Sequence, residues 1–150
     1  MDWLLSTAIT FGMFAFHFAI RFLIPGLVIF LHRGTYAYNN FWFRPKRWEP
    51  RIYQFLKVKT WKSKVLSYHP EQFSFKCHTA EEIINYMCQA EIVHECIVIG
   101  SFTSLFFAIP FGALPVFLIT AIFAAGIDLL FVIIQRYNRP RIVKMIKKTA

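Results

Sequence analysis

Acidic residues are scarce in this chain. Its 150 residues include eight aspartates and glutamates against 17 lysines and arginines, which gives a formal net charge of +9 at pH 7. That balance is unusual for a water-soluble protein in which 57% of the residues are hydrophobic. Basic regions that face an anionic membrane leaflet or a phosphorylated molecule would account for both properties.

Cysteines are also few. The three cysteines, Cys77, Cys88 and Cys96, are odd in number and show no C-x-x-C spacing. This pattern argues against a disulfide framework and against a structural zinc site.

Familiar catalytic signatures are missing as well. The chain has no P-loop, no dinucleotide-binding glycine pattern and no nucleophile elbow. No histidine is followed five positions later by an acid, so the His-x4-Asp motif of soluble-faced glycerolipid acyltransferases is absent. Glu91 and His94 form a single E-x-x-H motif. Because carboxylate-bridged di-iron bundles need two such motifs and two further carboxylates, we expect no metal.

What the chain does have is long apolar runs, including 18 phenylalanines. About 20 helical residues cross the roughly 30 Å hydrocarbon core of a bilayer. We therefore expect an all-α integral membrane fold in a single domain, residues 1–150, with about three transmembrane helices at residues 3–31, 91–109 and 113–134. Pro25 is expected to kink the first helix or to divide it into a span and a re-entrant piece.

The ends of the second and third helices carry further signals. Thr79 and Glu82 have capping-box spacing, which predicts that the second helix begins near residue 80 and follows the interface before it enters the membrane. Pro110, Gly112 and Pro115 predict a tight turn before the third helix. Pro140 is expected to stop the third helix.

The basic residues are unevenly distributed. Residues 32–90 hold ten of the 17 lysines and arginines, and the basic tail, residues 135–150, holds six. The positive-inside tendency therefore predicts a multi-pass protein of the cell (plasma) membrane with its N-terminus outside and its C-terminus in the cytoplasm. Aromatic residues interleaved with lysines and arginines make residues 32–90 an expected interfacial segment. No nucleic-acid partner is expected, because no recognisable binding motif accompanies the charge.

This topology brings the start of the second helix and the end of the third to one leaflet. Glu91 and His94 are three positions apart and share a helix face, so Glu91 could orient the imidazole for proton transfer. His94 and Glu91 are therefore the predicted catalytic residues. An ordinary interfacial polar cluster that holds helices together is the structural alternative.

Charged residues inside the predicted spans need partners. Arg21 is expected to pair with Asp128 or Glu95, and the alternative is a cation that lines a tunnel for a lipid substrate. The predicted substrate-binding residues are Gln135, Arg136, Asn138, Arg139, Arg141, Trp61, Lys62, Glu95, Asp128 and Arg21.

Three segments resemble a known family in the same order along the chain. They are Trp61-Lys62, Ala90-Glu91-Ile92-Val93-His94 and Gln135-Arg136-Tyr137-Asn138-Arg139-Pro140-Arg141, supported by the block from Phe43-Arg44 to Trp48-Glu49 with Tyr53 and Lys59. The chain is similar here to the glycosyl-4,4'-diaponeurosporenoate acyltransferases of the staphyloxanthin pathway, over residues 41–144. Glu95 follows His94 where the family pattern has an aromatic residue.

The resemblance implies a small integral membrane enzyme that transfers a fatty acyl group to a hydroxyl, which in the named members is a sugar hydroxyl of a carotenoid glycoside. In such a mechanism His94 removes the hydroxyl proton. Gln135 and Asn138 stabilise the oxyanion or position the sugar. Arg136, Arg139 and Arg141 hold the phosphate of an acyl-CoA or phospholipid donor, and Trp61 and Lys62 line the entrance.

The expected partners are membrane lipid, an acyl donor and a glycosylated lipid acceptor. No bound cofactor is expected, and the sequence does not predict the oligomeric state. Direct transfer is preferred over an acyl-enzyme, because neither Cys88 nor Cys96 is flanked by cations that would activate a thiol. The alternative from another class is a non-catalytic lipid-binding or scaffold membrane subunit. A second enzymatic alternative is methyl transfer of the isoprenylcysteine type, which would need S-adenosylmethionine.

Overall fold

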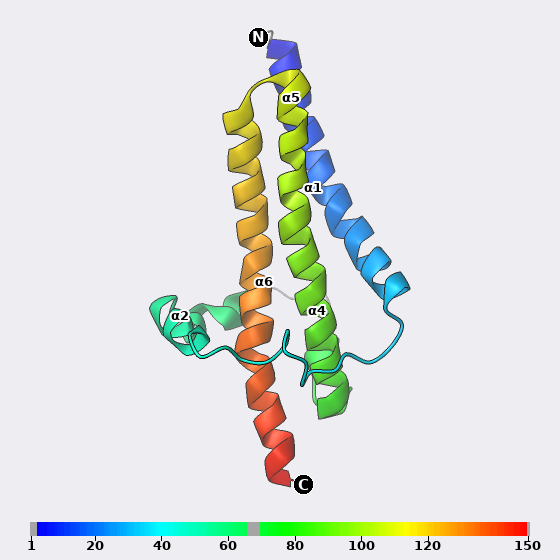
Figure 1. The fold of residues 1–150 in the computed structure, drawn as a ribbon, viewed down its shortest axis with the longest axis vertical. Helices are drawn as coiled ribbons and strands as arrows, with labels where there is room; N and C mark the ends of the chain where they lie inside the picture. The colour runs from blue at the N-terminus through cyan, green and yellow to red at the C-terminus, as the bar shows by residue number, and fades with distance from the viewer. Residues whose placement is uncertain (1–2, 66–69, 150) are drawn as a thin grey trace. The chain divides into compact units, whose positions relative to one another are not determined.

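The computed structural model describes residues 3–65 and 70–149, and all of its regular elements in these ranges are helices. In chain order they are α1 (Trp3–Leu31), α2 (Glu49–Phe55), α3 (Val58–Trp61), η1 (Lys62–Lys64), η2 (Pro70–Phe73), α4 (Ala80–Ser101), η3 (Phe102–Phe107), α5 (Ala108–Phe111) and α6 (Leu114–Thr149) (Figure 1).

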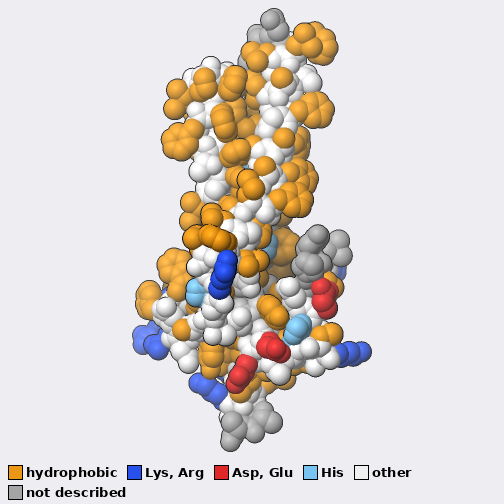
Figure 2. Space-filling model, turned by 90° about the vertical axis from the view of Figure 1, so that its right-hand side faces the viewer, with side chains coloured by type: hydrophobic (Ala, Val, Ile, Leu, Met, Phe, Trp, Pro, Cys, Tyr) orange, Lys and Arg blue, Asp and Glu red, His pale blue; other side chains and the backbone are white. Residues whose placement is uncertain are grey.

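Three helical segments are long and apolar enough to cross a membrane. They are Trp3–Leu31, Ala80–Phe111 and Leu114–Lys148. Their outward faces carry large exposed side chains such as Phe22 and Ile109, which are 75% and 82% exposed. Hydrophobic side chains crowd the surface of these helices (Figure 2). Such faces are costly in water and suited to lipid, and the predicted all-α fold with three candidate spans is confirmed.

The start of α4 and the turn before α6 can be compared with the capping box and the tight turn predicted from the sequence. At the start of α4, the Thr79 N–H donates to Glu82 Oε2 at 2.7 Å, and the Glu82 N–H donates to Thr79 Oγ1 at 3.3 Å. This reciprocal capping box confirms the predicted start near residue 80. The predicted turn before the third helix is found at Gly112 and Ala113, whose φ values are 69° and 48°.

The structure contradicts the prediction for Pro140 and excludes one of the two alternatives given for Pro25. Pro140 lies inside α6 and does not end it. The basic tail is therefore the last part of one long helix, because a single proline removes only one backbone N–H and the buried side chain of Arg139 fixes the helix immediately before it. Pro25 lies inside the continuous α1, so that helix is not divided into two pieces.

The chain forms two compact units. Unit 1 contains Met1–Arg33 and Ile92–Leu130, and unit 2 contains Gly34–Glu91 and Phe131–Ala150. The boundaries fall inside α4 and α6, so each of these helices contributes residues to both units. A single domain over residues 1–150 stays a prediction.

Unit 1 is a helical bundle built around small residues. Ala121, Ala124 and Ala125 are buried on α6. Gly100 on α4 lies against α1, where an added Cβ would meet Ile24 Cδ1 at 3.2 Å and Ile20 Cγ2 at 3.5 Å. Small residues let helices approach closely, which is how helix packing gains van der Waals energy in lipid.

Unit 2 packs the segment after α1 against the first turns of α4 and the last turns of α6. Its buried hydrophobic residues are Phe43, Val58, Ile83, Ile84, Met87, Cys88 and Val132. Lys57 adopts left-handed backbone angles, φ 50° and ψ 40°, between α2 and α3. This turn reverses the chain between the two short helices.

The close approach at Gly100 predicts that Gly100→Leu lowers the stability of unit 1. The larger side chain would displace Ile20 and Ile24, and overpacking of this kind costs about 1–3 kcal/mol. Thermal unfolding in detergent, followed by tryptophan fluorescence, measures the change. Gly126→Leu is the matched control, because a Cβ there meets nothing within 4 Å. Equal stability of the two variants would contradict close packing at Gly100.

Candidate functional site

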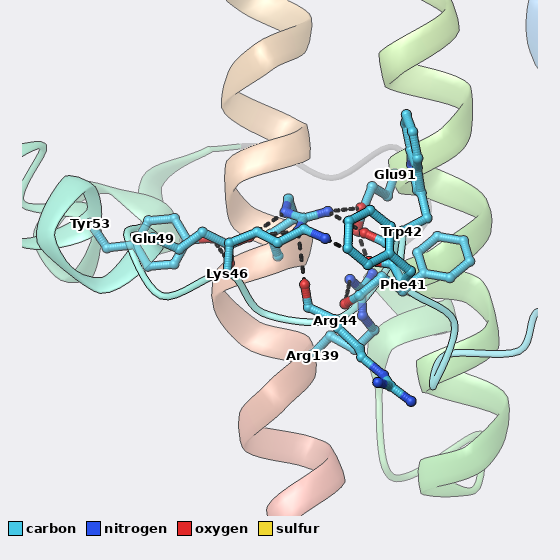
Figure 3. Close-up of polar contacts among 10 residues, drawn as sticks. Phe41, Trp42, Arg44, Lys46, Glu49, Tyr53, Glu91 and Arg139 are labelled. Atoms are coloured by element: carbon cyan, nitrogen blue, oxygen red, sulfur yellow. Dashed lines mark hydrogen bonds and ion pairs between the residues drawn. The ribbon is translucent and has the colours of Figure 1, made fainter.

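A buried network of four charged side chains organises unit 2 (Figure 3). It consists of Glu49, Glu91, Arg136 and Arg139, and we call it the Glu91 network. Glu91 is 0% exposed, and Glu49 and Arg139 are each 2% exposed. Two carboxylates face two guanidinium groups, so the network is neutral in sum, as buried charges require.

Arg136 uses all five of its N–H donors within the protein. Its Nε and Nη2 donate to Glu49 Oε1 at 3.0 and 2.5 Å, and its Nη1 donates to Glu91 Oε1 at 2.5 Å. The remaining bonds run to the backbone oxygens of Trp42 at 3.1 Å and Arg44 at 3.2 Å. A guanidinium has five N–H groups, so this side chain is saturated.

Arg139 is fixed in a similar way. Its Nη1 donates to Glu91 Oε2, its Nη2 donates to the Phe43 oxygen at 2.7 Å, and its guanidinium lies 5.0 Å from the centre of the Phe43 ring. The sequence assigned phosphate binding to Arg136 and Arg139. In the structure the contacts of both side chains hold the chain segment 42–49 against α4 and α6.

The other predicted binding residues of unit 2 lie outside the Glu91 network. Lys62 Nζ donates to Asn138 Oδ1 at 2.6 Å, and Trp61 Nε1 donates to the Leu56 oxygen at 2.8 Å. Burial, with the nearby charge of Arg141, lowers the pKa of Lys62. Gln135 is buried at 7% exposure. Arg141 donates to the Tyr137 oxygen and lies over the Tyr137 ring, 3.5 Å from its centre.

A second polar cluster lies in unit 1 among otherwise apolar helices. His94 on α4 places Nδ1 2.9 Å from Asp128 Oδ1 on α6. Asp128 Oδ2 forms an ion pair with Arg21 on α1, which is one of the two pairings predicted for Arg21. We call these three residues the His94 cluster.

Arg21 is held by further bonds on both sides of this cluster. Its Nη2 also donates to the Ala124 oxygen at 3.1 Å, and its Nη1 donates to the His17 oxygen at 3.0 Å. The Asp128 side chain is 3% exposed, while 23% of the His94 side chain is accessible. The acid is therefore fixed in the bundle and the imidazole is partly open.

The structure changes which acid holds His94. The sequence suggested Glu91, but both Glu91 oxygens accept from arginines, and the acid at Nδ1 of His94 is Asp128. Glu95, predicted as a binding residue, is half-buried on α4 in unit 1. The buried Cys88, 0% exposed, leaves direct transfer as the prediction for the acyl group.

Sequence reasoning missed the part that Glu49 and Tyr53 play in the Glu91 network. Glu49 accepts from Arg136, and Tyr53 Oη donates to Glu49 Oε2 at 2.8 Å. Burial, followed by the hydrogen bond to Glu49, raises the pKa of Tyr53. A signal was present, because Glu49 is the only acid between Asp2 and Glu71. A lone acid among so many cations is a strong candidate for a buried ion pair.

No metal centre is evident in the part of the chain that the structure describes, where no group of three or more His, Cys, Asp or Glu side chains is placed to bind an ion.

No curated protein and no solved structure matches the chain. Residues 39–148 match the model of the glycosyl-4,4'-diaponeurosporenoate acyltransferase family. The chain belongs to this family. In this acyltransferase family member, the Glu91 network, His94 and Asp128 all lie within the matched residues, and Arg21 lies before them.

The buried charge of Glu91 predicts a large loss of stability for Glu91→Gln. The substitution leaves Arg139 in the interior without its carboxylate, which costs about 3–5 kcal/mol. Thermal and denaturant unfolding measure the loss, and Glu81→Gln, at an exposed site on the same helix, serves as control. The double variant Glu91→Leu with Arg139→Leu should recover most of the loss. Unchanged stability of Glu91→Gln would rule out a buried ion pair there.

Substitution of the buried His17 is expected to raise stability, in contrast to substitution of Glu91. It is 8% exposed, and neither ring nitrogen has a hydrogen-bond partner among the described residues. A buried polar group without a partner costs about 1–3 kcal/mol, so His17→Leu should raise the unfolding temperature. His17→Asn keeps a polar side chain and should give no gain. A lower unfolding temperature for His17→Leu would indicate that the imidazole makes a stabilising contact.

Proposed function

We propose that the chain transfers a fatty acyl group to a hydroxyl of a lipid-linked or glycosylated acceptor, at the cytoplasmic leaflet of the cell membrane. The observation that carries this proposal is the His94–Asp128 hydrogen bond at 2.9 Å, fixed by the ion pair of Asp128 with Arg21. Membership of an acyltransferase family gives the reaction class. The glycosylated acceptor is proposed from the same family description.

The His94–Asp128 pair has the chemistry of a general base. An ionised carboxylate only accepts hydrogen bonds, so Nδ1 of a neutral His94 carries the proton and Nε2 is the basic nitrogen. Asp128 also stabilises the imidazolium that forms when Nε2 takes a proton. The same division between a base and the acid that orients it operates in Ser-His-Asp enzymes.

The proposed reaction needs no covalent intermediate on the protein. His94 Nε2 takes the proton of the acceptor hydroxyl while the hydroxyl oxygen attacks the acyl carbonyl carbon. The tetrahedral intermediate then collapses, and the bond from the carbonyl carbon to the donor's sulfur or oxygen breaks. The leaving thiolate or alkoxide receives the proton from the imidazolium, and the products are the new ester and the deacylated donor.

Two residue roles differ from those that the sequence suggested. Asp128 takes the orienting role that was assigned to Glu91, because it is the acid in contact with Nδ1. Arg136 and Arg139 become structural residues of unit 2, because Arg136 is saturated and Arg139 is buried and bonded to Glu91 and the Phe43 oxygen. Gln135 and Asn138 lie in unit 2, where Gln135 is buried and Asn138 accepts a hydrogen bond from Lys62, so their role in positioning the acceptor stays a prediction from the sequence.

The membrane would surround the long helices and hold the lipid substrates. The outward apolar faces of α1, α4 and α6 would lie in lipid, with the N-terminus outside and the C-terminus in the cytoplasm, as the distribution of lysine and arginine favours. The acyl chain would then lie along these faces, and the polar acceptor would approach from the headgroup region. Membrane lipid, an acyl donor and a glycosylated lipid acceptor are the proposed partners.

A scaffold subunit is the competing function. The saturated Glu91 network favours it, since most of its polar contacts are explained by holding helices and a loop together. The two functions differ in one respect, because a scaffold needs no basic nitrogen at residue 94. Activity measurements on His94 variants therefore separate them.

The mechanism predicts that His94→Ala strongly slows ester formation while the protein stays folded. The assay follows radiolabelled acyl groups from acyl-CoA or phospholipid to a glycolipid acceptor, with the purified full chain in nanodiscs. Loss of a general base should lower kcat by about 10²–10⁴-fold. His32→Ala, at an exposed histidine, is the control and should keep full activity. Equal activity of wild type and His94→Ala would remove His94 from the mechanism, and no activity with any donor would favour the scaffold.

The choice between Asp128 and Glu91 as the orienting acid has its own test. Asp128→Asn should lower kcat strongly, because an amide oxygen cannot stabilise the imidazolium as a carboxylate does. Glu91→Gln should keep its kcat when activity is expressed per folded molecule at low temperature. The reverse ranking of these two variants would restore Glu91 to the catalytic role.

A further inference from the structure

We propose that unit 2 carries a binding site for a phosphate group that is separate from the Glu91 network. The site is a cavity of about 680 Å³ beside α2, α3 and the last part of α6. Its lining combines four unneutralised cationic side chains with prolines and two tyrosines. The lining residues used in this argument are Tyr53, Lys57, Lys59, Tyr137, Arg141 and Lys144.

The charges around the cavity do not balance. Glu49 and Arg136 also line it, but they neutralise each other through their ion pair at 2.5 Å. Within residues 3–65 and 70–149, Lys57, Lys59 and Lys144 have no acidic partner, and Arg141 contacts the backbone oxygen and the ring of Tyr137 but no acid. Four cations around one cavity produce a positive potential, which favours an anion of high charge density.

The backbone at Lys57 supports a binding role for this turn. Its left-handed conformation, φ 50° and ψ 40°, costs a non-glycine residue about 1–2 kcal/mol. The turn is fixed by bonds from the Lys57 N–H to the Gln54 oxygen at 3.1 Å and from the Thr60 N–H to the Lys57 oxygen at 2.9 Å. It places both Lys57 and Lys59 on the cavity. Strained residues of this kind persist where the surrounding structure requires them, often at ligand sites.

The aromatic part of the lining suits a ligand with both a phosphate and a less polar body. The centres of the Tyr53 and Tyr137 rings lie 5.4 Å apart in an edge-to-face contact. Pro45, Pro50 and Pro140 complete an apolar surface. Because burial and the bond to Glu49 raise the pKa of Tyr53, its phenol stays protonated and adds no negative charge to the cavity. A phospholipid headgroup and the phosphates of coenzyme A share the required chemistry.

This inference does not rest on acyl transfer, because binding of a phosphate group in unit 2 requires nothing of His94. The sequence placed a phosphate site on Arg136, Arg139 and Arg141, and the proposed cavity keeps Arg141 but not the two arginines of the Glu91 network as phosphate ligands. The cations that remain available are those that the Glu91 network does not use.

Binding measurements with two probes test the site. The full chain in a non-ionic detergent is titrated with coenzyme A by calorimetry, and with dioctanoyl phosphatidic acid by native mass spectrometry. Dioctanoyl phosphatidylcholine, which carries no net charge, is the reference lipid. The site variant is Lys57→Asn with Lys144→Gln, in which asparagine tolerates the left-handed conformation. The control is Lys147→Gln with Lys148→Gln, which removes the same charge from exposed positions of α6, the helix of Lys144, that do not line the cavity.

We expect the site variant to bind at least one anionic probe about tenfold more weakly, with the control within twofold of wild type. Binding of coenzyme A would identify a soluble phosphate ligand, and binding of phosphatidic acid alone would identify a lipid headgroup. Equal weakening by the site and control variants would reduce the effect to general electrostatics and overturn the proposal. It would also be overturned if wild type bound neither anionic probe, or bound phosphatidylcholine equally well. If the first site variant does not fold, Lys59→Gln with Arg141→Gln replaces it in the same comparison.

Discussion

The ion pairing of Glu91 with Arg136 and Arg139 is the interaction on which unit 2 depends. Moving a charged group from water into the interior costs several kcal/mol, and only close opposite charges and further hydrogen bonds offset that cost. Here each charge has both. Glu91 uses both oxygens, and Arg136 reaches two acids and two backbone carbonyls. Segment 42–49, which has no long helix of its own, is held to α6 by these bonds.

The Glu91 network also explains why the cations of unit 2 divide into two groups. Arg136 and Arg139 offer planar forks of donors, which suit fixed bonds to carboxylates and carbonyls. The cavity cations are mainly lysines, whose compact charge on a flexible stem can adjust to a ligand. Composition shows only an excess of positive charge, and the structure separates the arginines of the Glu91 network from the cations that line the cavity.

The sequence predicted the elements that depend on local patterns. Apolar runs gave three helices long enough to cross a membrane, and the capping box at Thr79 gave the start of α4. It did not predict that α6 continues through Pro140, because the side chains that anchor that helix come from distant parts of the chain. The partners of Glu91 and His94 were missed for the same reason. Helical spacing places Glu91 and His94 on one face, but contacts between residues 34 to 48 positions apart decide the pairing of each.

The ion pair between Arg21 and Asp128 links the residues that match the family to a helix that precedes them. Asp128 lies within the residues that match the family, whereas Arg21 lies on α1, before the match begins at residue 39. A buried aspartate depends on its cation, so α1 cannot be replaced by an arbitrary membrane anchor without leaving a charge unpaired at the proposed catalytic base. Relatives that have lost this arginine should therefore have lost the aspartate as well, or should supply a cation from another helix. The two positions act as one structural pair, although they lie 107 positions apart.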